Sequence, residues 1–254
     1  MQANLMVRTA LQNGRTELLD CAFTAPYKIA KPFYEGTSMR LMVMGATPGL
    51  LDGDTLSWQV EAGPGTQTTL TGQSYTKVFC STGAGASQRI RLRVGAGARL
   101  FYLPQPVIPF AGSVFQSACE VDLAPDSVFA YLDIVAAGRT GMGERFQMER
   151  FCTRTEIRVA GKPVFLDNAW IWPGKLPVDG VGFCEGHSHQ GLLYLRAPGV
   201  NLVQMVRQVY EQAGNGVEMG VSAALDGAAV RFLADSGQAI ERLCAAILRS
   251  VSVK

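Results

Sequence analysis

Short turns recur at nearly constant spacing through a long run of strand-like sequence, and this recurrence restricts the possible folds most. Between residues 41 and 172, segments rich in aliphatic, β-branched and aromatic residues alternate with short breaks of small residues. The breaks are GPG at 63–65, GAG at 95–97 and PD at 125–126. Gly63 and Gly95 lie 32 positions apart, and Gly95 and Ala124 lie 29 apart. A period of roughly thirty residues in β sequence predicts stacked coils, as in a β-helix or solenoid.

An antiparallel sandwich with hairpins of similar length is the alternative fold. Several of the segments alternate apolar and polar residues, which is the period of a strand with one wet face. In RIRLRV at 89–94 the alternation places three arginines on the face that we expect to be solvated. Because both folds contain such strands, the pattern alone leaves both open.

The sequence changes character after Trp172, where PGKLPVDG indicates a linker or long loop. Apolar residues at helical spacing predict a helix at 202–214 and a second at 236–251. Between them, VSAALDGAAVRFLAD at 221–235 is typical of two strands joined by a tight turn. We therefore expect a mainly β, solenoid-like domain over residues 1–172. A helix–hairpin–helix unit over 173–254 would pack on its end.

Composition indicates a chain that binds other proteins rather than nucleic acid or a membrane surface. Charged residues make up 17% of the sequence, below the roughly 25% of typical soluble domains. The net charge is only +2, and no segment has the length and hydrophobicity of a transmembrane helix or signal peptide. The six cysteines include no CxxC pair. These features predict a cytoplasmic protein with reduced thiols.

No strong catalytic motif is present: P-loop, GxSxG and HExxH patterns are all missing. Both histidines occur in CEGHSH, where Cys184, His187 and His189 are weak candidate ligands for Zn²⁺ or Ni²⁺. An exposed turn followed by a strand is the simpler interpretation of this segment. A metal bound here would be transient, and we expect no tightly bound cofactor.

Three acidic residues interrupt apolar or small sequence, namely Asp54, Asp133 and Glu144. Asp54 ends the run TPGLLDGD, in which Pro48, Gly49 and Gly53 predict a tight, rigid turn. A carboxylate within an apolar strand needs a partner, water or a cation, because isolated burial is costly. For Asp133 the alternatives are an ion pair with Arg139 or a hydrogen bond to the backbone.

Several segments in order resemble the urease accessory protein family called UreD in many bacteria and UreH in some. They are APYKIAKPFYEG (25–36), TPGLLDGD (47–54), VEAGPGTQTTLTGQSYTKVF (60–79), VGAGARLFYLPQPVIPF (94–110) and LDIVAAGRTGMGERF (132–146). The strong part of the match spans residues 21–172, and AAVRFLAD at 228–235 resembles the family's C-terminal signature. The resemblance implies a β-helical stack with a small helical addition, which favours the solenoid over the sandwich.

The resemblance also implies a role in urease maturation without catalytic turnover. Members of the family act as scaffolds that join UreF and the nickel-binding GTPase UreG to urease apoprotein, so that nickel reaches the urease site. The missing P-loop agrees with GTP chemistry carried by UreG. On this reading Asp54, Asp133 and Glu144 are candidate stations of a nickel conduit, offering weak oxygen ligands and water rather than a tight cage.

Two other functions stay open on the residues themselves. One is a metal-dependent hydrolase that uses Cys184, His187 and His189. The other is a purely adhesive β-solenoid, in which carboxylate substitutions matter only where they damage folding or assembly.

Overall fold

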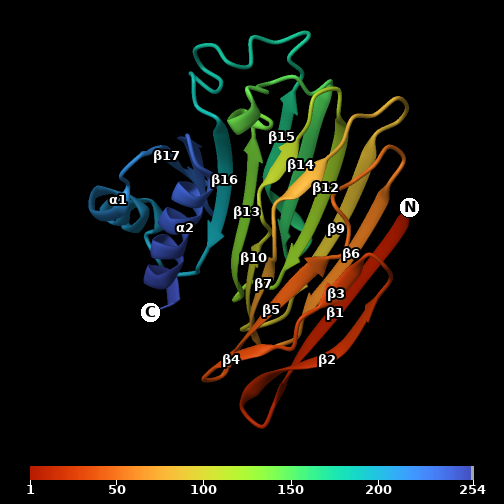
Figure 1. Ribbon diagram of the computed structural model, residues 1–254. Coiled ribbons are helices and arrows are strands. Elements are labelled where there is room, and N and C mark those ends of the chain that lie inside the picture. Colours follow the sequence, from red (N-terminus) through yellow and green to blue (C-terminus); the bar gives the residue numbers. More distant parts are fainter. Residues whose placement is uncertain (253–254) are drawn as a thin grey trace.

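Two β-sheets face each other in the computed structural model, which describes residues 1–252, and two helices cover the outside of one sheet (Figure 1). The seven-stranded sheet contains, in spatial order, β15 (Lys162–Ile171), β14 (Arg150–Val159), β12 (Val114–Leu123), β9 (Ala86–Val94), β6 (Thr55–Ala62), β1 (Gln2–Gln12) and β2 (Arg15–Phe23).

The eleven-stranded sheet follows one main path with three short strands beside it. Its path is β17 (Val217–Ala224), β18 (Gly227–Ala234), β16 (His189–Arg196), β13 (Val128–Ala136), β10 (Arg99–Leu103), β7 (Gln67–Gly72), β5 (Ser38–Gly45) and β3 (Tyr27–Ile29). The short strands are β4 (Phe33–Glu35), β8 (Thr76–Val78) and β11 (Val107–Pro109).

The chain passes back and forth between the sheets from β5 to β14, placing successive long strands in opposite sheets. Neighbours within each sheet then run parallel: β6 pairs with β9, β9 with β12, and β12 with β14, while β7 pairs with β10 and β10 with β13. Parallel neighbours contributed by successive turns of the chain define a β-helical coil. The solenoid prediction is therefore confirmed, and the antiparallel sandwich is wrong for this part of the chain.

The recurring small-residue breaks stack on one another at one end of the coil. The Gly95 amide donates to the carbonyl of Ala62, and the Ala124 amide donates to that of Val94, at 2.8 and 2.9 Å. At Gly63 a Cβ atom would lie 2.6 Å from the carbonyl oxygen of Thr9, so this position has no room for a side chain. The period of roughly thirty residues is thus the length of chain between successive stacked turns of the coil.

The C-terminal region extends the eleven-stranded sheet beyond β13 with antiparallel strands. β16 pairs with β13 and with β18, and β17 pairs with β18 through a two-residue turn at Leu225 and Asp226. Helices α1 (Leu202–Ala213) and α2 (Gly237–Ser252) flank this hairpin in sequence, as predicted. The side chain of Asn201 caps α1 by accepting from the Gln204 amide at 3.2 Å.

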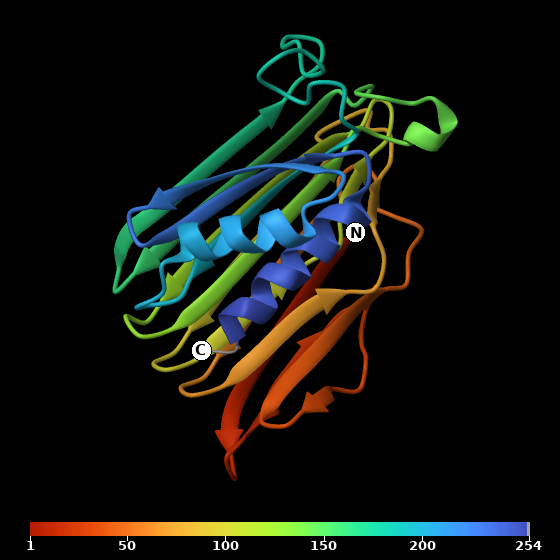
Figure 2. The ribbon, with the colours of Figure 1, turned by 90° about the vertical axis from the view of Figure 1, so that its left-hand side faces the viewer.

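Two apolar cores result from these layers. One lies between the two sheets, and the other lies between the outer face of the eleven-stranded sheet and helices α1 and α2. Figure 2 shows the two helices in front of the strands that they cover. In residues 1–252 no helix has both the length and the hydrophobicity to cross a membrane.

Candidate functional site

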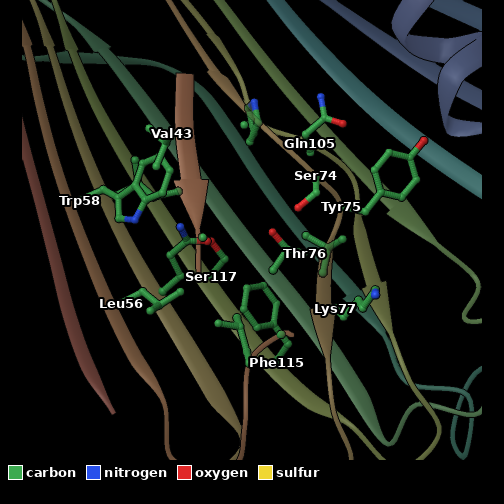
Figure 3. A pocket seen from close by; sticks show the side chains of 18 of the residues that line it. Val43, Leu56, Trp58, Ser74, Tyr75, Thr76, Lys77, Gln105, Phe115 and Ser117 are labelled. Atoms are coloured by element: carbon green, nitrogen blue, oxygen red, sulfur yellow. The ribbon is translucent and has the colours of Figure 1, made fainter. Parts of the chain in front are cut away.

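A cavity of about 290 Å³ lies between the two sheets, with aromatic rings in its wall. Tyr27 packs edge-on against Trp58, with 5.3 Å between ring centroids, and Trp58 packs against Tyr102 at 6.1 Å. Figure 3 shows Trp58 and Leu56 on one side, and Thr76, Lys77 and Gln105 across from them. We call this the aromatic cavity.

Two polar atoms in the wall of the aromatic cavity have no hydrogen-bond partner within the protein. They are the Tyr27 hydroxyl and the indole nitrogen of Trp58, on side chains of residues that are each only 8% exposed. Buried polar groups of native proteins are paired with protein or with ordered water. The indole N–H of Trp58 is nevertheless near enough to the Tyr27 hydroxyl to oppose the rise that burial causes in the pKa of Tyr27.

A second cavity of about 550 Å³ lies where the eleven-stranded sheet extends past β15, the last strand of the other sheet. Its charged lining residues are four carboxylates and one guanidinium: Asp133, Asp167, Glu185, Glu218 and Arg231. We call this the acidic cavity. It shares Asp133, Phe151 and Thr153 with the aromatic cavity, so the two cavities meet at these residues.

Asp133 stands at this meeting point because of the alternation of β13. Phe129, Tyr131 and Val135 belong to the core between the sheets, and Asp133 follows the same period of two. Burial, together with the nearby carboxylate of Asp167, raises the pKa of Asp133 to about 6, while hydrogen bonds from Thr153 and Tyr131 oppose the shift. Near neutral pH this carboxyl group exchanges its proton readily and offers oxygen atoms to a cation.

The predicted alternative for Asp133, an ion pair with Arg139, is wrong, because Arg139 binds Glu144 instead. Glu144 is 6% exposed and accepts a second hydrogen bond from the Ala111 amide at 2.6 Å. Both of its oxygens are thus in use, in the turn that contains the short 3₁₀ helix Thr140–Met142. Glu144 does not line either cavity.

Asp54 is also held by local partners. It is 3% exposed; one oxygen lies 2.7 Å from the amino group of Met1, and the other accepts from the Leu51 amide at 2.8 Å. Like Glu144, it lies outside the lining of both cavities. The structure therefore brings neither residue together with Asp133.

The turn before Asp54 is in contact with the aromatic cavity. Pro48 and Gly49 line that cavity, and Gly53 has the left-handed φ of 78° that favours glycine. A Cβ atom on Gly49 would lie 2.6 Å from the Lys77 carbonyl oxygen and 2.7 Å from the Phe79 ring. The small residue at 49 thus lets the turn pack directly on the chain around β8.

The three residues of the CEGHSH segment point to separate partners. The Cys184 sulfur lies 3.7 Å from the Gln190 side-chain oxygen, and the His189 ring contacts the Ser188 hydroxyl at 2.8 Å. The His187 ring lies 3.3 Å from Glu218 and 3.5 Å from Asp235. Burial raises the pKa of Cys184 to about 11 and lowers that of His189. Within residues 1–252, no three His, Cys, Asp or Glu side chains gather closely enough to hold a metal ion.

Sequence reasoning missed Asp167 and Arg231, which form an ion pair at the acidic cavity. Asp167 lies in β15 and Arg231 in β18, so the pair connects the two sheets. A signal for Asp167 was present, since it interrupts the apolar run VFLDNAW in the same way that Asp133 interrupts its own strand. The pairing across 64 residues had no local signal.

The two cavities together bring carboxylate and hydroxyl oxygens into the space between the sheets. Oxygen atoms of these kinds are ligands that divalent cations accept. Among residues 1–252 they are spread over both cavities rather than gathered into one closed set.

Comparison with known proteins gives a family for the whole chain. The family model described as "UreD urease accessory protein" matches residues 1–253. The chain is 40% identical to the urease accessory protein UreD of Acetivibrio thermocellus over 191 residues, which is 74% of this chain and 73% of that protein. It is 32% identical to UreD of Acaryochloris marina (89% and 81% covered) and 30% identical to UreH of Helicobacter pylori strain G27 (87% and 83%).

Proposed function

Because the chain belongs to the UreD family of urease accessory proteins, we propose that it is a urease maturation scaffold through which nickel travels. It joins UreF and the GTPase UreG to urease apoprotein in the cytoplasm. Its own contribution to nickel delivery is the path between the two sheets, and it has no catalytic turnover.

The observation that carries this proposal is the meeting of the aromatic and acidic cavities at Asp133. Ni²⁺ is borderline in softness and accepts carboxylate and water. Burial and the neighbouring Asp167 carboxylate raise the pKa of Asp133 because they favour a positive partner for its oxygens, whether a proton or a metal ion. Within residues 1–252 the possible ligands are too far apart to form a closed site, which keeps any one position weak. Weak binding suits a conduit, since an ion must leave each station.

Asp133 is the station on which the proposal depends. Asp54 and Glu144 are proposed as further stations only if they release their present partners, the Met1 amino group and Arg139. The predicted ligands of the CEGHSH segment have no part in the path: Cys184, His187 and His189 do not line either cavity, although Glu185 of the same segment lines the acidic cavity.

The decisive test is urease activation in a reconstituted system at limiting nickel. We expect Asp133→Asn to lower activation by about tenfold, the scale of effects for groups that support metal sites, and to do less harm at saturating nickel. Asp122→Asn is the matched control, because Asp122 is exposed on β12. Full activation by Asp133→Asn at limiting nickel would contradict the conduit and favour a purely adhesive scaffold.

The scaffold role has its own test. Co-expression with UreF is expected to raise the yield of folded chain, because a charge-poor protein with exposed apolar side chains is stabilised by a partner that covers them. An unchanged yield together with failure to co-purify would contradict that part of the proposal.

A further inference from the structure

Among the residues that the structure describes, Arg231 is the only one with a cationic side chain that lines the acidic cavity. It faces the cavity because of the register of the eleven-stranded sheet. Asp133 pairs with Leu192, and Leu192 pairs with Arg231, so these three residues share one row. Residues in one row project from the same face of a sheet.

The row also sets the reach of the guanidinium. Two strand spacings, about 10 Å in total, separate the backbones at Arg231 and Asp133. Across the cavity, Arg231 forms its ion pair with Asp167, which belongs to the opposite sheet. Asp167 is close enough to Asp133 to raise the pKa of that carboxyl group. The arginine therefore ends beside Asp167, the carboxylate that neighbours Asp133.

The two members of the ion pair differ in their freedom to move. The Asp167 side chain is 11% exposed, whereas that of Arg231 is 64% exposed. The carboxylate is fixed in the wall, and the guanidinium reaches it from the solvent side on a long flexible stem. Moving the arginine outward would cost little desolvation and would leave Asp167 free to bind another cation.

We propose that Arg231 is a tethered counter-ion, which holds Asp167 while the path is empty and is displaced when a divalent cation enters the acidic cavity. The arginine then sets how tightly this part of the path retains metal. The inference rests on the proposed function, because it concerns the same nickel path. It adds a residue that tunes the affinity of that path for its cargo.

Exchange of one cation for another explains why an arginine is useful here. In the empty path, its positive charge prevents Asp133 and Asp167 from standing as unpaired neighbouring carboxylates. When a divalent ion arrives, the guanidinium leaves for water, and Asp167 exchanges one cationic partner for another. The competition weakens metal binding, which allows the ion to move on.

Nickel binding to the purified full-length chain tests the proposal directly, by isothermal titration calorimetry in a buffer that does not chelate metal. We expect Arg231→Gln to bind Ni²⁺ about fivefold to tenfold more tightly than the original chain, the scale set by losing one partly exposed ion pair as competitor. Asp167→Asn should bind more weakly, and the double variant should resemble Asp167→Asn. Arg89→Gln, at an exposed position on β9, is the control for a change in net charge.

Unchanged or weaker nickel affinity in Arg231→Gln would overturn the proposal, as would an equal gain in Arg89→Gln. If Arg231→Gln does not fold, judged by its near-UV circular dichroism, Arg231→Lys replaces it. An ammonium lacks the two-pronged geometry of the guanidinium, so this variant should also bind nickel more tightly, by a smaller factor. Unchanged nickel affinity in Arg231→Lys would also overturn the proposal.

The two proposals fail separately. If Asp133→Asn activates urease fully while Arg231→Gln binds nickel more tightly, the conduit is wrong and the tethered counter-ion stands. If Asp133→Asn fails to activate while Arg231→Gln binds nickel as the original chain does, the conduit stands and the role of Arg231 is wrong.

Discussion

The two faces of the eleven-stranded sheet both carry an apolar core, but they differ in how completely that core is packed. In β13 the residues Ala130, Leu132 and Ile134 point into the core beneath the helices, whereas Tyr131 and Asp133 face the other sheet. The helix side is apolar and closely packed. The side between the sheets contains two cavities, four carboxylates and polar atoms without protein partners.

This contrast bears on how the sheet is stabilised. Buried polar groups and cavities lower stability, since both forgo apolar contacts. Helices α1 and α2 bury residues such as Val206, Ile240 and Ile247 completely against the opposite face. Their apolar burial offsets the cost of the cavities and the buried polar groups on the other face.

The largest expected effect that tests this contrast comes from two neighbouring leucines in β16. Leu193 is fully buried beneath the helices, while Leu192 lines the acidic cavity. We expect Leu193→Ala to lower the free energy of unfolding by about 3 to 4 kcal/mol, because a closely packed site cannot collapse around the lost atoms. Leu192→Ala should cost about 2 kcal/mol, because its surroundings already border a cavity.

Urea denaturation measures both leucine variants, with a shift in midpoint at constant slope as the sign of a change in stability. Equal losses in the two variants would show that the faces do not differ in packing.

Substitution of Asp133 gives a smaller effect that depends on pH. Its folded-state pKa of about 6 lies above the ordinary aspartate value of 3.8. The native state therefore holds the proton more tightly, and the contribution of Asp133 to stability is lost as pH rises from about 4 to about 6. Relative to the original chain, Asp133→Asn should gain about 1 to 3 kcal/mol between pH 4 and pH 8.

Urea denaturation of both chains at pH 4 and pH 8 measures this gain, and Asp122→Asn at the exposed position on β12 again serves as the control. A stability difference that does not change with pH would mean that Asp133 keeps an ordinary pKa. Ionising a carboxyl group on the cavity face would then cost no more free energy than ionising one on the protein surface.

The smallest expected effect concerns the hydrogen bond from Thr153 to Asp133 on the cavity face. Thr153 hydrogen-bonds to the Asp133 carboxylate and opposes the rise of its pKa. Replacing this hydroxyl in Thr153→Val should raise the pKa of Asp133 further above 6, by less than about one pH unit. NMR titration of the labelled aspartate carboxyl carbons measures the change, and a lowered pKa would contradict the assigned role of Thr153.

Local chemistry made much of the fold predictable. The GPG, GAG and PD breaks mark the stacked turns of the coil, and the apolar periodicity marks both C-terminal helices within one residue of their observed ends. Such signals lie within a few residues of one another, so they act before any distant contact forms. Asp133 was identified in the same way, as a carboxylate that breaks an apolar strand.

The grouping of charged residues between the sheets had no such signal. Asp54 and Glu144 attracted attention for the same reason as Asp133, yet only the folded chain shows that an amine and Arg139 hold them. Asp167 and Arg231 come from different sheets, and the extension of one sheet past β15 creates the cavity in which they meet. By itself the sequence determined the strands, the turns between them and the carboxylate within the strand, because those depend on near neighbours. Only the tertiary structure decided which charges share the interior, because strand register and sheet length depend on contacts across the whole chain.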